Sequence, residues 1–494
     1  MKRWTPIAPA VVTAAALAVA IVGCATPPPP GGVALDVEIP DSWSVDFATP
    51  RAESAPWWSD LGVGPVDTLI REALETNRNL DAATANVEAA RAAATIAGAD
   101  RFPQLNGSFQ GSRAKQIFVG LPIPGGGVLS SQTNNFGLSA QASWEIDLWN
   151  RLGLRERAAV ADLQAAEADL AAARLSISGL VARTFIALTE LERQRALAER
   201  TVDAFRETLA IAEDRYDRGL ISSVDVHLTR TQTENTAALL ALRQNQLQTT
   251  ARQLEVLLGR YPSGTLRVAA EFPRSVGEIP AGLPADLVLR RPDLLAAERR
   301  LVAAQARSGE ARRNLLPRLT LTGSTGTTSN QLGDLLDGDF GVWSIAGSLL
   351  QPIFQGGRLR AQVRANVAAE DATMAQWAQS VLDAFADVET ALAADTLLAA
   401  RESHLANALD ASTRAWRLAE DRYRQGIGNL LSVLEAQRGA LNAESELIAV
   451  RSTRLQTRVD LHLALGGGFD ATTGPTSDFL DPTNERPTDS PASE

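Results

Sequence analysis

Apolar and polar residues alternate along the chain from Asn135 to Leu148. The even positions are apolar and include Phe136 and Trp144, whereas the odd positions are Asn, Gly, Ser, Gln, Glu or Asp. A period of two predicts a strand with one apolar and one polar face. Similar patterns predict further strands at about 105–115, 318–326 and 340–351.

Two long stretches between the strand pairs are rich in Ala, Leu, Gln and Arg, from Leu154 to Arg218 and from Leu359 to Gln425. These residues favour helix, and sixty helical residues extend for about 90 Å. Both predicted helices end at a glycine, which can adopt the left-handed conformation that stops a helix. A return helix then begins near a capping residue, either Ser222 with Asp225 or Asn429 with Ser432.

The strand pair and the helical hairpin occur twice. Arg215–Gly219 corresponds to Arg422–Gly426 at an offset of 207 positions. Upstream, Phe102–Leu105 corresponds to Leu316–Leu319, and Trp149–Arg155 to Phe354–Arg360. A duplication of this length predicts two equivalent halves about a pseudo-symmetry axis. We assign them to residues 66–260 and 287–468, joined by a linker at 261–286.

The amino terminus has the pattern of an export signal. Lys2 and Arg3 precede an apolar run that ends at Gly23, and Cys24 is the only cysteine of the chain. This favours a lipoprotein signal at 1–23, acylation of Cys24, and a tether over 24–65. The alternative is an ordinary signal peptide, or a membrane helix, with a chance cysteine. No later stretch approaches the eighteen consecutive apolar residues of a helical membrane span.

Composition limits the possible partners and location. The net charge of −11 argues against nucleic acid as a partner. Residues 469–494 are rich in Thr, Pro, Ser and Asp, and we expect them to be disordered. Strands with an aromatic-bearing apolar face fit a soluble sheet packed on a helix, or a wall in the outer membrane with its polar face toward a lumen. The export signal favours the wall.

Four strands cannot close a barrel, because about eight are needed before the interior side chains fill the space. Open strand edges in lipid would leave backbone groups unpaired, which costs several kcal/mol each. We therefore predict an α+β membrane protein, internally duplicated, in which other copies of the chain complete the sheet. A trimer would supply twelve strands, and the composition of the long helices suits the wall of a tube.

The lipobox, the repeated order of strands and helices, and two sequence runs together resemble the outer membrane factors of the TolC and OprM type, including the NodT-like efflux lipoproteins. The two runs are Arg-Tyr-x-x-Gly at each helix end and Arg290–Asp293. The resemblance covers roughly Trp57 to Gly468. It implies a homotrimer in which each chain adds four strands to a twelve-stranded barrel in the outer membrane. The long helices would form a helical barrel that continues this exit duct through the periplasm. It also implies a periplasmic adaptor and an inner-membrane pump of the RND type as partners.

The resemblance also implies a gate at the periplasmic helix tips. Tyr423 matches the gate tyrosine of the family, and Glu435 lies where a constriction aspartate often occurs. The sequence departs from the family pattern at Gly428 and Ser432. The residues that we assign to the gate and to adaptor docking are Tyr216, Asp217, Arg218, Gly219, Asp225, Tyr423, Arg424, Gly426 and Glu435.

A passive channel needs no catalytic residue, cofactor or metal, and we predict none. His227, His404 and His462 lack metal-ligand spacing, which makes an enzyme the least favoured interpretation. The main alternative to a channel is a periplasmic coiled-coil lipoprotein that acts as an adaptor or scaffold.

Overall fold

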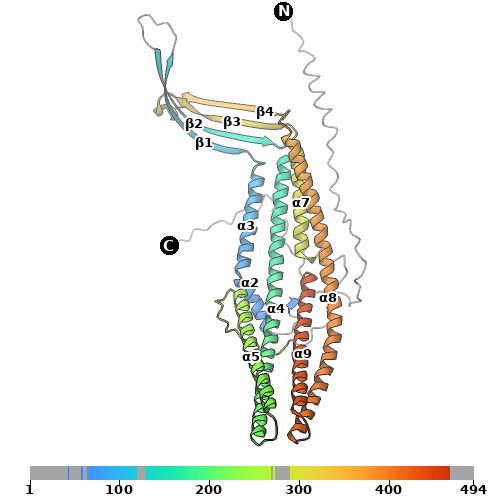
Figure 1. The fold of residues 1–494 in the computed structure, drawn as a ribbon. Coiled ribbons are helices and arrows are strands. Elements are labelled where there is room, and N and C mark those ends of the chain that lie inside the picture. The colour runs from blue at the N-terminus through green and yellow to red at the C-terminus, as the bar shows by residue number, and fades with distance from the viewer. Residues whose placement is uncertain are drawn as a thin grey trace, which may run out of the picture. The chain divides into compact units, whose positions relative to one another are not determined.

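The computed structural model describes Trp43 and residues 57–58, 64–118, 129–268, 271–272 and 290–467. The predicted signal peptide, Cys24, most of the tether, part of the linker and the tail at 469–494 lie outside the described residues. Figure 1 shows a set of long helices that lead into a four-stranded sheet.

Helices and strands alternate along the chain in two similar series, labelled as in Figure 1. They are α2 (Gly64–Thr76), α3 (Arg78–Ala99), β1 (Gln104–Phe118), β2 (Leu129–Ile146), α4 (Arg151–Asp217), α5 (Ser223–Leu257), α7 (Pro292–Arg313), β3 (Arg318–Ser329), the 3₁₀ turns η3 (Leu332–Leu336) and η4 (Gly338–Phe340), β4 (Gly341–Leu350), α8 (Arg358–Arg424) and α9 (Leu430–Ala464).

The repeated elements have matching lengths. Helices α4 and α8 have 67 residues each, α5 and α9 have 35 each, and α3 and α7 have 22 each. The glycines that end the two long helices, Gly219 and Gly426, have φ angles of 73° and 81°. These left-handed angles stop each helix and turn the chain into the next one.

The entry into each long helix corrects one predicted correspondence. The residue before α4 is Asn150, with φ 57°, and the residue before α8 is Gly357, with φ 82°. These two positions lie 207 apart, so the alignment of Trp149–Arg155 with Phe354–Arg360 was wrong by two residues. A shared Leu-Arg pair suggested that alignment, whereas the left-handed position, which Asn and Gly tolerate, sets the true register.

Each repeat contains an equivalent junction between the start of one helix and the end of another. The residue that precedes α3, Asn77, donates from Nδ2 to the carbonyl of Leu257 at the end of α5 (2.8 Å). Its counterpart before α7 is Arg291, whose Nη1 donates to the carbonyl of Ala464 at the end of α9 (3.5 Å). The last carbonyls of a helix have no partner within it, so each junction satisfies a helix end while it fixes the return helix.

Arg291 also explains the Arg-Arg-Pro-Asp run at the start of α7. Its guanidinium pairs with Asp293 at 2.8 Å and with Asp387 of α8 at 3.0 Å. Pro292 occupies the first turn, where a missing N–H costs nothing. Burial by itself raises the pKa of Asp293, but hydrogen bonds and the charge of Arg291 outweigh it, so the pKa lies below its ordinary value. The run therefore ties α7 to α8.

The sheet is antiparallel, in the order β1-β2-β3-β4. The second strand begins at Leu129, earlier than its alternating pattern indicated, and β1 extends to Phe118. Strand β2 ends at Ile146, before the predicted end at Leu148. Asp147 accepts hydrogen bonds from the backbone N–H groups of Arg151 (2.6 Å) and Gly153 (2.8 Å), so it caps α4 and does not extend the strand.

The apolar core lies among α2, α4, α5 and α9. Trp57, Phe185 and Leu254 are among its fully buried side chains. Within the described residues, α4 also contains an eighteen-residue window that is apolar enough to cross a membrane, which inspection of the sequence missed. However, at 67 residues α4 is far longer than the roughly 20 residues of a span, and its apolar side chains pack in this core.

Glu255 holds the turn that follows α5. Its buried carboxylate accepts hydrogen bonds from the backbone N–H groups of Gly264 (2.6 Å), Thr265 (3.0 Å) and Leu266 (3.0 Å). Burial alone raises the pKa of Glu255, but these hydrogen bonds outweigh it, so the pKa lies below its ordinary value.

We expect Glu255→Gln to lower the free energy of unfolding by about 1–3 kcal/mol, because a charged acceptor is lost. In the native protein this contribution is fully present above pH 4.5, the ordinary pKa, and is lost as the pH falls through the lower folded-state value. Thermal melting followed by helical circular dichroism between pH 3 and 7 measures both effects. The control is Glu75→Gln, which changes an exposed glutamate on α2. Equal losses of unfolding free energy in the two variants would contradict the role assigned to the Glu255 carboxylate.

Candidate functional site

One face of the sheet is apolar across all four strands. The strand registers align the odd residues of β1, β3 and β4 with the even residues of β2. This face carries Leu105, Phe109, Phe136, Leu138, Trp144, Ile146, Leu319, Leu321, Trp343, Ile345 and Leu349. The turn η3 covers its far end, where the Thr327 hydroxyl donates to the carbonyl of Leu335 (2.6 Å). The rest of the face is largely uncovered by the described chain: Trp343 is 77 % exposed and Ile345 is 79 % exposed. An uncovered apolar surface of this extent needs lipid or another protein against it.

The opposite face of the sheet is mostly polar. Ser108 and Ser139 share a hydrogen bond of 2.9 Å across β1 and β2, and Ser324 and Ser344 share one of 2.8 Å across β3 and β4. Asn106, Gln141 and Thr322 belong to the same face by register. The sheet is therefore two-sided in the way the alternating pattern predicted.

The tips of the two helical hairpins meet through Arg215 and Tyr423. Arg215 lies in the last turn of α4, and its Nη2 donates to the carbonyls of Tyr423 (2.9 Å) and Arg424 (3.3 Å). Its guanidinium carbon also lies 4.2 Å from the centre of the Tyr423 ring. A cation from one hairpin thus satisfies the carboxyl end of the long helix of the other hairpin. We call this set of interactions the tip contact.

The two tip tyrosines have different surroundings despite the duplication. Tyr423 is 4 % exposed and packs with Leu430 and Val433 in a small cluster, whereas Tyr216 is 47 % exposed. The Tyr423 hydroxyl is buried and has no hydrogen-bond partner within the described chain. The tip contact therefore uses one tyrosine of the repeated pair and leaves the other at the surface.

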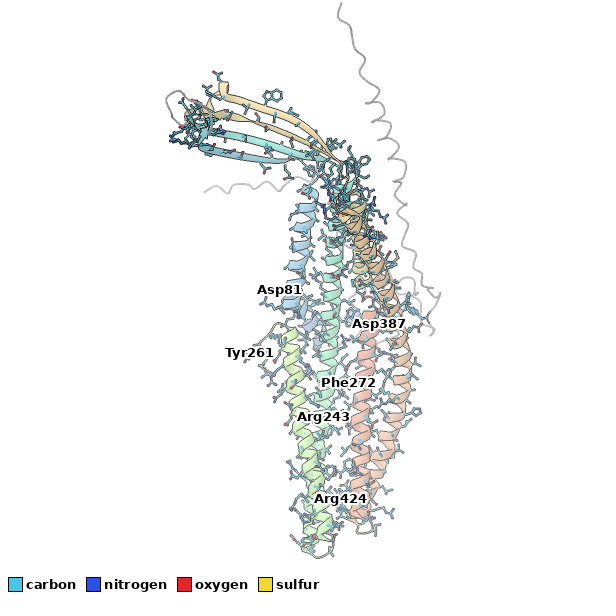
Figure 2. All side chains as sticks on the ribbon, turned by 45° about the horizontal axis from the view of Figure 1, so that its top comes forward. Asp81, Arg243, Tyr261, Phe272, Asp387 and Arg424 are labelled. Carbon is cyan, nitrogen blue, oxygen red and sulfur yellow. The ribbon has the colours of Figure 1, made fainter. Side chains whose placement is uncertain are left out.

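The other predicted gate residues serve several local roles. Asp225 accepts from the backbone N–H of Ser222 (3.3 Å) at the start of α5, and Arg218 pairs with Asp214 at 2.8 Å. Arg424 pairs with Glu207 across the hairpins at 3.1 Å, and Glu435 pairs with Arg438 of its own helix at 2.9 Å. Asp217 is exposed at the end of α4. Figure 2 shows Arg424 near the tips.

Arg215 was not among the predicted gate residues, although it belongs to the repeated run at the helix ends. The signal that could have singled it out is its position one turn before a helix-ending glycine, beside a second tip with the same residues. Its counterpart Arg422 is exposed. Sequence equivalence could not reveal which of the two arginines makes the contact.

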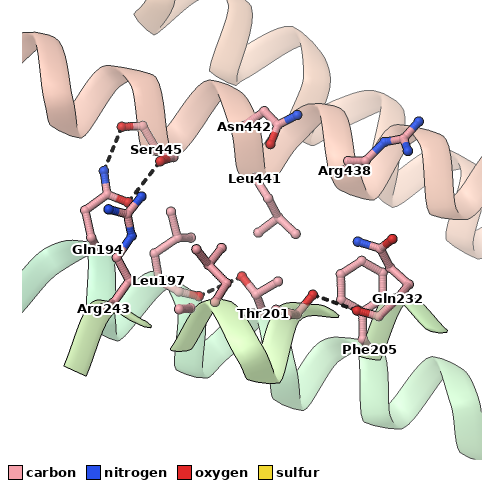
Figure 3. A pocket seen from close by; sticks show the side chains of 13 residues that line it. Gln194, Leu197, Thr201, Phe205, Gln232, Arg243, Arg438, Leu441, Asn442 and Ser445 are labelled. Atoms are coloured by element: carbon pink, nitrogen blue, oxygen red, sulfur yellow. Dashed lines mark hydrogen bonds between the residues drawn. The ribbon is translucent and has the colours of Figure 1, made fainter. Parts of the chain in front are cut away.

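A cavity of about 120 Å³ lies above the tips, between α4, α5 and α9 (Figure 3). Its upper end is closed by a reciprocal pair: Gln194 donates to the carbonyl of Ser445 (3.0 Å), and the Ser445 hydroxyl donates to Gln194 (2.9 Å). Leu197, Thr201 and Phe205 line its α4 side. The hairpins are therefore incompletely packed between this pair and the tip contact.

Ion pairs connect α8 to α9 along the second hairpin. Asp395 accepts from Arg454 (3.1 Å) and Arg458 (3.0 Å), and Glu402 accepts from Arg451 (2.9 Å). Burial tends to raise the pKa of Asp395, but the hydrogen bonds and charges of its two arginines leave the pKa below its ordinary value. The hairpin is thus held by charged networks as well as by its apolar seam.

Comparison with known proteins identifies the family. The sequence profile described as "Outer membrane efflux protein" matches residues 69–260 and 283–467. The chain belongs to the outer membrane efflux protein family. Members of this family are channels and not enzymes, so the resemblance to TolC-type proteins, the α+β fold class and the absence of an enzymatic role that the sequence predicted are confirmed.

Individual relatives cover most of the chain. This chain is 31 % identical over 441 residues to the pyoverdine export outer membrane protein OpmQ of Pseudomonas aeruginosa. The match covers 87 % of this chain and 92 % of OpmQ. The chain is 33 % identical over 402 residues to the solvent efflux pump outer membrane protein SrpC of Pseudomonas putida, covering 81 % and 85 %. Among solved structures, the Campylobacter jejuni CmeC outer membrane channel matches with a TM-score of 0.83 at 25 % identity, covering 90 % of this chain and 95 % of CmeC.

No group of three or more His, Cys, Asp or Glu side chains within the described residues is arranged to hold a metal ion. Several carboxylates at the tips and along the hairpins, such as Glu207, Glu435 and Asp395, are instead paired with arginines.

Tyr423 provides a test of the tip cluster. We expect Tyr423→Phe to protect the helix-end amides at least as well as the native residue, because the hydroxyl has no partner in the described chain to lose. Tyr423→Ala should lower the free energy of local unfolding at this tip by roughly 3 kcal/mol, because the ring fills a buried cluster. Hydrogen–deuterium exchange over residues 419–433 measures both.

The matched control is Tyr216→Ala at the exposed counterpart, which should change exchange at its own tip little. Reduced protection in Tyr423→Phe would contradict the expectation.

Proposed function

We propose that this outer membrane efflux channel is a homotrimer whose twelve strands close a barrel and whose helices form a duct through the periplasm. The largely uncovered apolar face and the two edge strands support the proposal. Strands β1 and β4 each have one side without a partner among the described residues. In lipid such an edge costs several kcal/mol for each unpaired backbone group, and pairing β4 of one copy with β1 of the next removes both edges.

The polar face of the sheet then lines a wet lumen, and the apolar face lies against lipid. We propose residues 66–260 and 287–468 as the two halves of the channel, with 261–286 as the linker. Acylation of Cys24, after removal of residues 1–23, adds an anchor to the outer membrane through the tether at 24–65. Acyl chains contribute about 0.8 kcal/mol for each buried CH₂ group.

We further propose that the hairpin tips are the gate and the docking region for a periplasmic adaptor, which links the channel to an inner-membrane pump of the RND type. The tip contact is the part of the gate within one chain. The offset of 207 relates Arg215 to Arg422, and Tyr423 to Tyr216. We therefore expect Arg422 to contact Tyr216 of the partner subunit in the same way that Arg215 contacts Tyr423 within one chain. Three contacts within subunits would alternate with three between them.

The cargo is set by the pump and not by the duct. The relatives include one protein named for pyoverdine export and one named for solvent efflux. Similar channels with such different cargo support a passive role for the duct, so we assign small molecules as substrates without a narrower class.

Conductance in planar bilayers tests the gate. We expect Arg215→Ala and Arg422→Ala each to raise the mean single-channel conductance of the purified protein, because each removes one class of tip contact. The double variant should exceed both. Tyr423→Ala should act in the same direction. The matched control is Arg206→Ala, which removes an exposed arginine that pairs with Asp203 of the same helix at 3.4 Å.

Any of three results would count against this function: no pore in any variant, a conductance that no tip substitution changes, or an equal rise in conductance with Arg206→Ala.

Native mass spectrometry of the detergent-extracted protein tests assembly and anchoring together. The expected particle contains three chains, each of which starts at Cys24 and carries acyl groups. Cys24→Ser should lose the acyl mass and keep the trimer. A mature chain that is monomeric and soluble in water would contradict the barrel, and three unacylated chains would contradict the anchor alone.

A further inference from the structure

The apolar face of β1 ends in two basic residues. The face continues along the odd positions from Leu105, Gly107, Phe109 and Gly111 to Arg113 and Lys115. By register Arg113 lies opposite Asn134 and Lys115 opposite Gln132. Arg113 donates from Nη2 to the Gln132 side chain at 3.2 Å, which confirms that the two belong to one face. Both basic side chains are exposed.

The height of this pair along the strands corresponds to a membrane boundary. Trp144 and Asn134 lie on the same face of β2, ten residues apart, which is about 33 Å along a strand. At a tilt of about 40° this gives roughly 25 Å, the height of the apolar band of an outer membrane barrel. Arg113, opposite Asn134, therefore lies at the upper edge of the band when Trp144 marks the lower edge.

The number of paired strands falls at about the same position along the sheet. The last residue of β3, Ser329, pairs with Phe136, so β1 and β2 continue beyond it as a two-stranded ribbon (Figure 1). Arg113 follows two residues after Gly111, the residue opposite Phe136. Arg113 and Lys115 therefore follow the aromatic residues Phe109 and Phe136 along the strands, toward the end of the sheet that is farther from the helices.

The outward strand positions carry no negative charge, and the Asp334 carboxylate of η3 on this face accepts a hydrogen bond from the Ser329 hydroxyl (2.6 Å). Within the described strand residues, the outward positions of β1, β2, β3 and β4 include no carboxylate, and Arg113 and Lys115 are their only charged residues. Arg113 and Lys115 are two positions apart on one row, with about 7 Å between their Cα atoms and no acid on that row. A guanidinium and an ammonium in this arrangement suit a partner with more than one negative oxyanion group.

We propose that Arg113 and Lys115 form a lipid site that binds the phosphates of a bis-phosphorylated glycolipid in the outer leaflet of the membrane. The proposal rests on the barrel proposed above, which places this row against lipid. Two phosphates on one headgroup can reach both cations, whereas phosphatidylglycerol or phosphatidylethanolamine offers one phosphate. Three copies of the site would surround the trimer and bind lipid at its outer rim.

Lys115 makes the site directly measurable, because it is the only lysine of the chain after Lys2, which the predicted signal peptide removes. In the purified full-length protein, we expect bis-phosphorylated lipid A micelles to slow acetylation of Lys115 by an amine-reactive reagent. The slowing should be about tenfold, because charge-assisted bonds to phosphate are among the strong ones. Dephosphorylated lipid A and phosphatidylglycerol should protect Lys115 much less.

A variant series measures retention of the same lipid by native mass spectrometry. Arg113→Gln with Lys115→Gln should retain lipid A at least tenfold more weakly than the native protein. The matched control removes two exposed arginines from the helices, Arg206→Gln with Arg414→Gln, and should bind as the native protein does.

Equal retention by the two double variants, or no protection of Lys115, would overturn the site. Equal protection by phosphatidylglycerol would overturn the choice of a glycolipid. Trimer mass and conductance are read on the same samples. A conducting trimer without lipid protection rejects the lipid site alone, whereas a monomer without conductance rejects the barrel.

Discussion

A backbone N–H or C=O group cannot be left unpaired in hydrocarbon, and the four-stranded sheet of this channel has two edges at which such groups face outward. Its apolar face is also largely uncovered, with Trp343 and Ile345 mostly exposed within one chain. A soluble sheet would bury that face on a helix. In this channel the helices continue from the ends of the strands and pack on one another, so the face remains available for lipid.

In the helical part, separate contacts hold the helices of 67 residues in position at both ends. Near the core, the junctions at Asn77 and Arg291 connect the start of one helix to the final carbonyls of another. At the far end, Arg215 does the same for α8. Both devices use the orphan carbonyls of a helix terminus as acceptors, which makes helix ends the fixed points of the duct wall.

Between these fixed points the two hairpins are joined unevenly. The Gln194–Ser445 pair is followed toward the tips by a cavity and then by the tip contact. The tip contact is thus made by residues other than those of the junctions and the core.

The sequence by itself determined which elements form and that they form twice. Period-two alternation identified the strands, glycines able to adopt positive φ ended the long helices, and the offset of 207 related the halves, because these signals depend on local conformation. Strand limits and the register at Asn150 were missed, since capping by Asp147 and a left-handed residue are geometric events that alternation does not record.

The site could be predicted only in part. The tips were correctly placed at the ends of the hairpins, and their tyrosines and arginines follow from the repeat. Only the tertiary structure decided that Tyr423 is buried and Tyr216 exposed, and that Arg215 makes the contact while Arg422 does not. The physical reason is that one chain packs its first hairpin against its second on one side only, so identical local sequences meet different neighbours.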